Sequence, residues 1–85
     1  MTHTHLPPLT DTQSRVFEFI RDHNARTRTG AGFRQICQAF GFASPNAAYG
    51  HCLSLRKKGW ITFESNRANT IIPTLESLEA SDDEA

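Results

Sequence analysis

With 85 residues, of which 38% are hydrophobic, the chain is long enough for one small domain with a modest core. Its formal net charge of zero, taken alone, argues against a nucleic-acid partner. No apolar run is close to the length of a membrane span, which is about 18 residues. The first residues lack the basic and apolar regions of a signal peptide. We therefore expect a cytoplasmic protein without a membrane partner.

The N-terminal half begins with an expected flexible arm, residues 1–8, which closes on two prolines. Thr10 and Gln13 then have the spacing of a capping box, which predicts the start of a helix. Apolar residues recur every three or four positions behind it, so we predict a helix over roughly residues 11–25. Residues 27–32 break this period and are predicted to form a loop.

Two further helices follow, over about residues 33–40 and 45–58, with a tight turn between them. Gly41 can adopt the left-handed conformation that ends a helix. Ser44 is a favourable N-cap, and Pro45 suits the first helical position. A short helix, a sharp turn and a second helix with a polar front are typical of the helix-turn-helix motif that enters the DNA major groove.

The last predicted helix has two unlike sides. Its apolar spacing predicts a buried side made of Ala48, Cys52 and Leu55. The opposite side then presents Asn46, Gly50, Leu53 and Lys57. Cys52 and the earlier Cys37 both fall at apolar positions, so we expect reduced, buried thiols rather than a disulfide.

The hydrophobic period changes after Gly59, the expected end of the third helix. Residues 60–64 and 70–72 are β-prone, and the polar residues between them predict a hairpin. The fold class is therefore α+β and mainly α: a three-helix bundle with a helix-turn-helix and a C-terminal two-stranded β-hairpin wing, over residues 9–73. Residues 74–85 are predicted to be an acidic, disordered tail.

The charges are distributed unevenly, and this distribution reverses the argument from net charge. Between Arg15 and Arg67 the chain has nine basic and three acidic residues, which gives this span a net charge of +6. From Thr74 onward it has five acidic residues and no basic ones, a charge of −5. A basic body with an acidic tail favours a nucleic-acid partner. The tail is either solubilising or a competitor of DNA for the basic surface.

Three stretches carry a resemblance to a known family: residues 9–23, residues 41–48 with the run Ser-Pro-Asn-Ala-Ala, and Lys58-Gly59. They resemble the N-terminal winged-helix domain of LexA, the bacterial SOS-response repressor. The similarity runs without gaps from about Leu9 to Ile72. It implies a winged domain that binds operator DNA and blocks transcription.

The resemblance also implies a set of residues at the DNA. It places Ser44, Asn46 and Ala47 there. In the family two acidic residues normally follow the second alanine, and this chain has Tyr49 and Gly50 at their positions. We therefore expect a changed operator sequence. LexA continues into a self-cleaving peptidase domain with a Ser–Lys dyad, and this sequence stops at Ala85. We expect no enzyme activity, no cofactor and no metal.

The predicted DNA-binding residues fall into two groups. Asn46 can make a bidentate contact with adenine, and Tyr49 can reach a phosphate or a thymine methyl. Gly50 either allows close approach of the helix to the bases or packs on the second helix, and Leu53 contacts either DNA or a protein. Phosphate contacts are expected from Ser44, Lys57, Lys58, Arg67, Arg28 and Arg34.

The sequence thus predicts a sequence-specific regulator of transcription, a repressor that binds double-stranded DNA and inserts the helix from Pro45 to Lys58 into the major groove. The alternative is a winged-helix module that binds a repressor or the transcription machinery, which Leu53 and the acidic tail favour. One such domain reads only a few base pairs, so we expect a homodimer on DNA or a partner protein.

Overall fold

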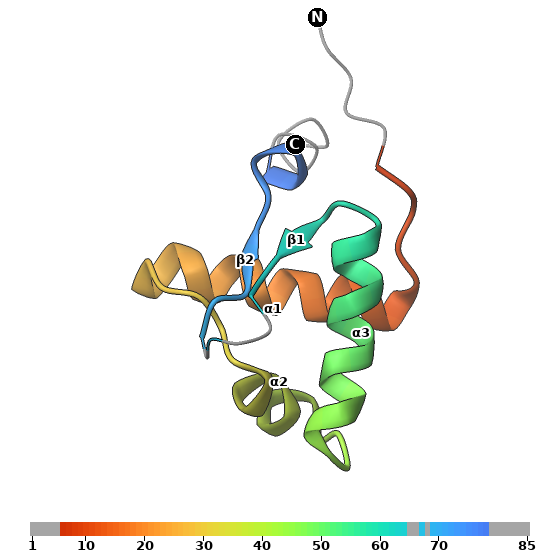
Figure 1. The fold of residues 1–85 in the computed structure, drawn as a ribbon, viewed down its shortest axis with the longest axis vertical. Helices are drawn as coiled ribbons and strands as arrows, with labels where there is room; N and C mark the ends of the chain where they lie inside the picture. The colour runs from red at the N-terminus through yellow and green to blue at the C-terminus, as the bar shows by residue number, and fades with distance from the viewer. Residues whose placement is uncertain (1–5, 65–66, 68, 79–85) are drawn as a thin grey trace, which may run out of the picture.

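The computed structural model describes residues 6–64, 67 and 69–78. Figure 1 shows a long first helix running behind the molecule, a short second helix below it, a third helix at one side and a small sheet in front of the first helix. The elements are α1 (Asp11–Thr27), α2 (Phe33–Phe40), α3 (Pro45–Lys57), β1 (Ile61–Thr62) and β2 (Ile72–Pro73). This confirms the predicted winged helix.

Helix α1 begins at the capping box that the sequence predicts. The Gln13 amide donates to Thr10 Oγ1 at 3.2 Å, and the Thr10 amide donates to Gln13 Oε1 at 3.1 Å. The helix continues two residues beyond the predicted end, to Thr27. Arg28 ends it in the left-handed conformation, with φ of 59°, and donates its amide to the Asn24 carbonyl at 2.8 Å. A non-glycine C-cap of this kind is hard to recognise from sequence.

The turn between α2 and α3 has the predicted geometry. Gly41 has a φ of 70° and ends α2. Ser44 is extended and Pro45 opens α3, as expected for an N-cap followed by proline at the first helical position. The turn is also tied back to α2, because Cys37 Sγ donates to the Ser44 carbonyl at 3.1 Å.

The core lies where the three helices and the sheet meet, and its buried apolar residues come from all of them. Ala48, Cys52 and Leu55 of α3 are fully buried, which confirms the predicted inner side. The full set is Val16, Phe17, Ile20, Ala31, Ile36, Ala48, Cys52, Leu55, Ile61, Phe63 and Ile71. Both cysteines are free thiols, as predicted, but only Cys52 is buried, whereas Cys37 is half-buried. Burial, and secondly the nearby Cys37, raises the pKa of the Cys52 thiol from 9.0 to about 12.

The wing is a short antiparallel pair in which Ile61 lies opposite Pro73 and Thr62 opposite Ile72. A third segment joins it. Ala31 and Ile71 form an antiparallel bridge with amide–carbonyl distances of 2.9 and 3.2 Å. One residue of the predicted loop over residues 27–32, Ala31, therefore pairs with the residue that directly precedes β2.

One glycine makes this approach possible. Gly30 precedes Ala31, and a Cβ on it would collide with the backbone of Asn69 and Thr70, whereas a Cβ on Gly32 would collide only with the Asn69 side chain. Glycine is the residue that permits such close approach of two backbones.

The described part of the expected flexible arm packs against the start of the wing. Trp60 Nε1 donates to the Pro7 carbonyl at 2.8 Å, and Lys58 Nζ donates to the Pro8 carbonyl at 2.9 Å. Trp60 also packs edge-on against Phe17, with ring centres 5.1 Å apart. Two residues of the predicted arm, Pro7 and Pro8, are thus bonded to the domain. Residues 1–5 lie outside the described part of the chain, and a flexible arm stays a prediction.

The predicted disordered tail begins with a helical turn instead. Residues 75–78 are helical, and Thr74 caps them through its hydroxyl, which accepts from the Ser77 amide at 3.1 Å. Ser77 is fully buried and donates its hydroxyl to the Thr74 carbonyl at 2.8 Å. The prediction for residues 79–85 falls outside the described residues. No helix in the described ranges is long and apolar enough to cross a membrane.

Candidate nucleic-acid interface

The outer side of α3 is the polar surface that the sequence predicts. Asn46, Gly50 and Lys57 are exposed, and they lie opposite the buried side of the helix. Ala47 is half-buried on the flank. One edge of a 13-residue helix, about 20 Å long, is therefore open to a partner.

The N-terminal end of α3 is also open. Ser44 is exposed and its hydroxyl makes no capping hydrogen bond, so it is available to a ligand oxygen. The Ser44 carbonyl accepts the Ala47 amide at 3.1 Å. No acidic residue stands in the first turn, so the positive end of the helix dipole is not neutralised there. This end favours a negative group such as a phosphate.

Gly50 lies in the middle of α3 without a packing reason among the described residues. A Cβ at this position would meet no atom within 4 Å. Close packing on α2, one of the two readings of this glycine, is therefore wrong. Glycine in a helix interior costs about 1 kcal/mol relative to alanine, so its presence on an exposed helix surface suggests a role toward a partner.

Two residues expected at the DNA are only half-exposed. Leu53 packs partly against the core, so it is less exposed than predicted. The Tyr49 ring lies 5.3 Å from that of Phe33 and 6.1 Å from that of Phe63, so Tyr49 lies on the flank of α3 that faces α2 and the wing. Leu53, seven residues from Asn46, lies between this flank and the outer side. Helical spacing predicted the inner and outer sides of α3, but not which flank of the helix α2 and the wing cover.

The predicted phosphate-binding cations are not all equivalent. Lys57 is exposed on α3, and Arg67 is exposed in the wing. Lys58 is only half-exposed, and its ammonium is held by the Pro8 carbonyl and by Gln13 Oε1, the latter at 2.7 Å. Lys58 therefore makes structural hydrogen bonds, and its phosphate contact stays a prediction. Arg28 lies at the C-terminal end of α1, away from α3 in Figure 1.

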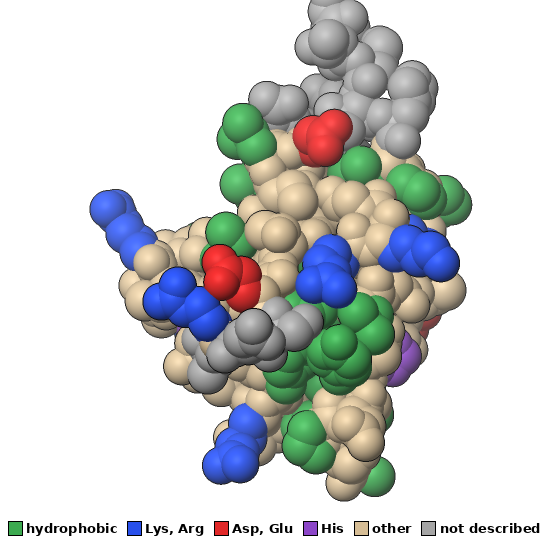
Figure 2. Space-filling view, in the orientation of Figure 1, with side chains coloured by type: hydrophobic (Ala, Val, Ile, Leu, Met, Phe, Trp, Pro, Cys, Tyr) green, Lys and Arg blue, Asp and Glu red, His purple; other side chains and the backbone are tan. Residues whose placement is uncertain are grey.

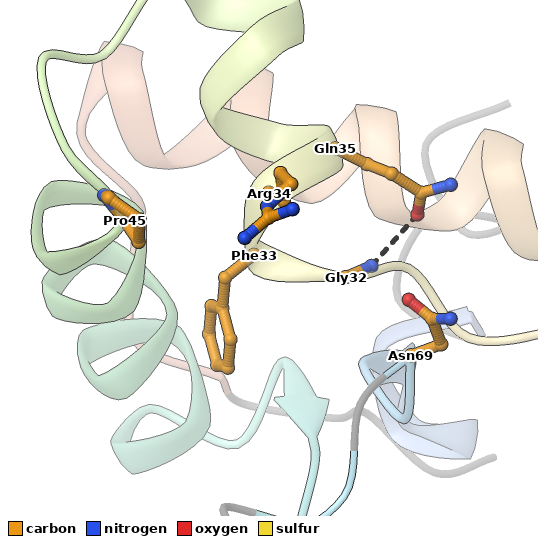
Figure 3. Close-up of a pocket in the computed structure, with 6 residues that line it drawn as sticks. All are labelled: Gly32, Phe33, Arg34, Gln35, Pro45 and Asn69. Carbon is orange, nitrogen blue, oxygen red and sulfur yellow. Dashed lines mark hydrogen bonds between the residues drawn. The ribbon is translucent and has the colours of Figure 1, made fainter.

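Arg34 lies beside a shallow pocket of about 420 Å³ between the starts of α2 and α3 and the wing (Figure 3). The pocket is lined by Gly32, Phe33, Arg34, Gln35, Pro45 and Asn69. The Gly32 amide donates to Gln35 Oε1 at 2.9 Å, which satisfies the first amide of the pocket wall. Arg34 therefore brings a positive charge close to the open end of α3.

The charges around this surface are not paired within the described ranges. Both ion pairs there lie on α1, between Asp11 and Arg15 and between Arg21 and Asp22, each at 3.4 Å. Figure 2 shows an apolar area beside α3 with basic side chains around it. Lys57 and Arg34 are thus available to an external anion.

Sequence reasoning missed Arg56 as a contributor to this region. Its guanidinium carbon lies 4.1 Å from the centre of the Phe63 ring, and its Nη1 donates to the Phe63 carbonyl at 3.1 Å. The signal available in the sequence was its spacing of seven residues from Tyr49, which places both on one flank of α3.

A helix-turn-helix whose second helix has an exposed polar side, followed by an antiparallel wing, defines the winged-helix class of domains. Within this class, residues 6–70 match the family model of the LexA DNA binding domain. The chain belongs to this family.

Relatives with the same domain have been described in several bacteria. The chain is 40% identical over 68 residues to the LexA repressor of Desulfatibacillum aliphaticivorans, a match covering 78% of the chain and 34% of the relative. It is 45% identical over 67 residues to that of Aromatoleum aromaticum, covering 75% and 32%. It is 36% identical over 76 residues to that of Glaesserella parasuis, covering 89% and 36%. The chain thus spans about a third of the length of these relatives.

Proposed function

We propose that the chain is a sequence-specific regulator of transcription that binds double-stranded DNA and acts as a repressor, with α3 inserted into the major groove. The observation that carries this proposal is the outer side of α3, where Asn46, Gly50 and Lys57 form one exposed edge. Membership of the family and the name of the relatives, LexA repressor, support it.

Some contacts of this surface would read the base sequence, and others would position the helix on the DNA. Asn46 would read a base edge, because its amide can bond adenine at two atoms, a contact worth about 1–3 kcal/mol of discrimination. Gly50 would allow the helix backbone to approach the bases. Ser44, at the open end of α3, and Lys57 would contact phosphates and position the helix without reading sequence.

Four exposed cations remain candidates for phosphate contacts: Lys57, Arg34, Arg67 and Arg28. If all four contribute, the logarithm of the binding constant should fall with the logarithm of salt concentration at a slope of about −3.6. Lys58 is left out because its ammonium is already bonded within the protein. A slope near zero would contradict a DNA-binding function.

The direct test is selection of binding sites from a random duplex library, followed by binding measurements with two variants. Asn46→Ala should relax base preference at one or two positions, and Lys57→Met should weaken all sequences by a similar factor. Arg15→Met is the control, because Arg15 is an exposed cation on α1, outside the helix-turn-helix, and pairs with Asp11. If the first two variants bind DNA like the unmodified protein, the alternative of a protein-binding module is favoured.

Useful specificity requires more than one domain on the DNA. A 13-residue helix contacts only a few base pairs, so we propose that two copies bind half-sites about one helical turn apart, or that one copy binds beside a partner protein. Sedimentation of the protein with and without the selected DNA tests this. One copy per site with full specificity would refute it.

A further inference from the structure

Two side chains on one flank of α3 face the wing rather than the solvent. Tyr49 and Arg56 are seven residues apart, close to two helical turns, and therefore lie above one another on the same flank. Both approach Phe63, the residue that directly follows β1. This flank is distinct from the outer side to which we assign DNA contacts.

Arg56 contacts both the ring and the backbone carbonyl of Phe63. Its guanidinium lies over the ring, 4.1 Å from the ring centre, and it donates to the carbonyl of the same residue at 3.1 Å. A guanidinium over an aromatic face is attracted by the ring quadrupole, and the hydrogen bond has a charged donor. Phe63 is 5% exposed, so this contact takes place at the edge of the core.

The second contact is a triangle of aromatic rings that joins three elements. Phe33 of α2 lies 5.3 Å from Tyr49 of α3 and 5.3 Å from Phe63, with interplanar angles of 69° and 90°. Tyr49 and Phe63 complete the triangle at 6.1 Å and 68°. All three pairs are edge-to-face, which is a favoured arrangement with a defined direction.

We propose that Arg56 is a positioning residue, which fixes the wing relative to α3 and does not itself bind DNA. The wing is short, because β1 and β2 are two residues each, and a two-stranded hairpin is marginal on its own, so its position depends on its contacts with the helices and on the bridge to Ala31. Because α3 and the wing would contact different parts of the duplex, fixing their spacing before binding lowers the ordering cost. This inference rests on the proposed function for its consequence, but not for its geometry.

The test compares Arg56→Met with Lys57→Met, which removes the neighbouring charge from the exposed side of the same helix. The first readout needs no DNA: amide exchange of Glu64, which donates to Thr70 Oγ1 at 3.0 Å, and of Ile71, which donates to Ala31. Arg56→Met should speed exchange of both about tenfold, and Lys57→Met should leave it unchanged.

An amide in the turn after α2, that of Phe42, serves as the internal reference, because it donates to Cys37 at 3.1 Å away from the wing. Its exchange should not change in Arg56→Met. Equal acceleration of Phe42 and the two wing amides would mean that the variant weakens the whole domain, and would overturn a local positioning role.

The second readout is the salt dependence of DNA binding. Lys57→Met should reduce the slope by about 0.9, as expected when one phosphate contact is lost. Arg56→Met should lower affinity several-fold with an unchanged slope. If it instead reduces the slope as Lys57→Met does and leaves wing exchange unchanged, then Arg56 is a phosphate contact and the proposal is wrong.

A double-mutant cycle isolates the contact between the Arg56 guanidinium and the Phe63 ring. Phe63→Leu removes the ring and keeps an apolar residue, so Arg56→Met should accelerate wing exchange less in this background than in the unmodified protein. Equal effects in both backgrounds would overturn the proposal. If neither the unmodified protein nor any variant binds DNA, the proposed function is wrong. Amide exchange in the wing still decides whether Arg56 positions the wing.

Discussion

Replacing Gly50 by alanine should make the protein more stable and a poorer DNA binder. Gly50 lies in the interior of α3, and a Cβ there would meet no atom within 4 Å, so nothing in the described fold opposes the methyl group. Alanine in a helix interior is favoured over glycine by about 0.5–1 kcal/mol. In a domain of this size, about 1 kcal/mol raises the melting temperature by about 4–8 °C.

The same methyl group should weaken binding if the backbone of α3 approaches the bases at this position. Thermal unfolding measures the first effect, and titration of the selected duplex measures the second. Gly41→Ala is the matched control: a Cβ there also meets no atom within 4 Å, but the φ of 70° is strained for alanine. This control should lose stability, by about 1–2 kcal/mol.

Two outcomes would refute the reasoning about Gly50. If Gly50→Ala is less stable than the unmodified protein, the helix at this position is not the unobstructed one described. If the variant is more stable and binds DNA with the same affinity and sequence preference, the glycine has no role toward DNA. The combination of gained stability and lost binding is the signature of a residue retained for a partner.

Three further predictions concern stability. Burial raises the pKa of Cys52 from 9.0 to about 12, so between these pH values the folded state keeps a proton that the unfolded chain releases. The free energy of unfolding should therefore fall as pH rises from 9 to 12, by up to about 1.4 kcal/mol per pH unit. Urea unfolding below and above pH 9 should show this fall, and Cys52→Val should abolish it. Lys58→Met should lower the melting temperature by about 4–8 °C, because the hydrogen bonds to Pro8 and Gln13 are lost. The salt slope of DNA binding should not change, and a reduced slope would show that Lys58 contacts a phosphate. Thr10→Ala should cost about 1 kcal/mol of unfolding free energy by removing the α1 cap, and an unchanged urea midpoint would contradict this.

The elements of the fold could be predicted because their signals are local. Thr10 with Gln13, Gly41, and Ser44 with Pro45 each specify a helix end through groups within three residues of one another. The buried side of α3 follows from helical spacing alone. These signals need no knowledge of what lies on the other side of the core.

The features that could not be predicted depend on contacts between distant segments. The bridge from Ala31 to Ile71 joins residues that are far apart in the chain, and the loop composition before α2 gives no sign of pairing. In the same way, helical spacing separates the inner from the outer side of α3 but leaves the flanks undecided. Tyr49 lies on a flank, and only the positions of α2 and the wing decide that it is partly covered.

The basic run Arg56-Lys57-Lys58 shows how this limit affects the electrostatic argument. Successive residues in a helix are rotated by about 100°, so three adjacent cations at its end point in different directions. Arg56 turns to Phe63, Lys58 turns to the start of α1, and only Lys57 remains exposed. A run that looks like one cluster of charge in the sequence therefore supplies one cation to a partner and two internal ties. If the chain binds DNA as we propose, its affinity would depend on cations spread over α2, α3, the wing and the end of α1, and therefore on how firmly these elements are held together.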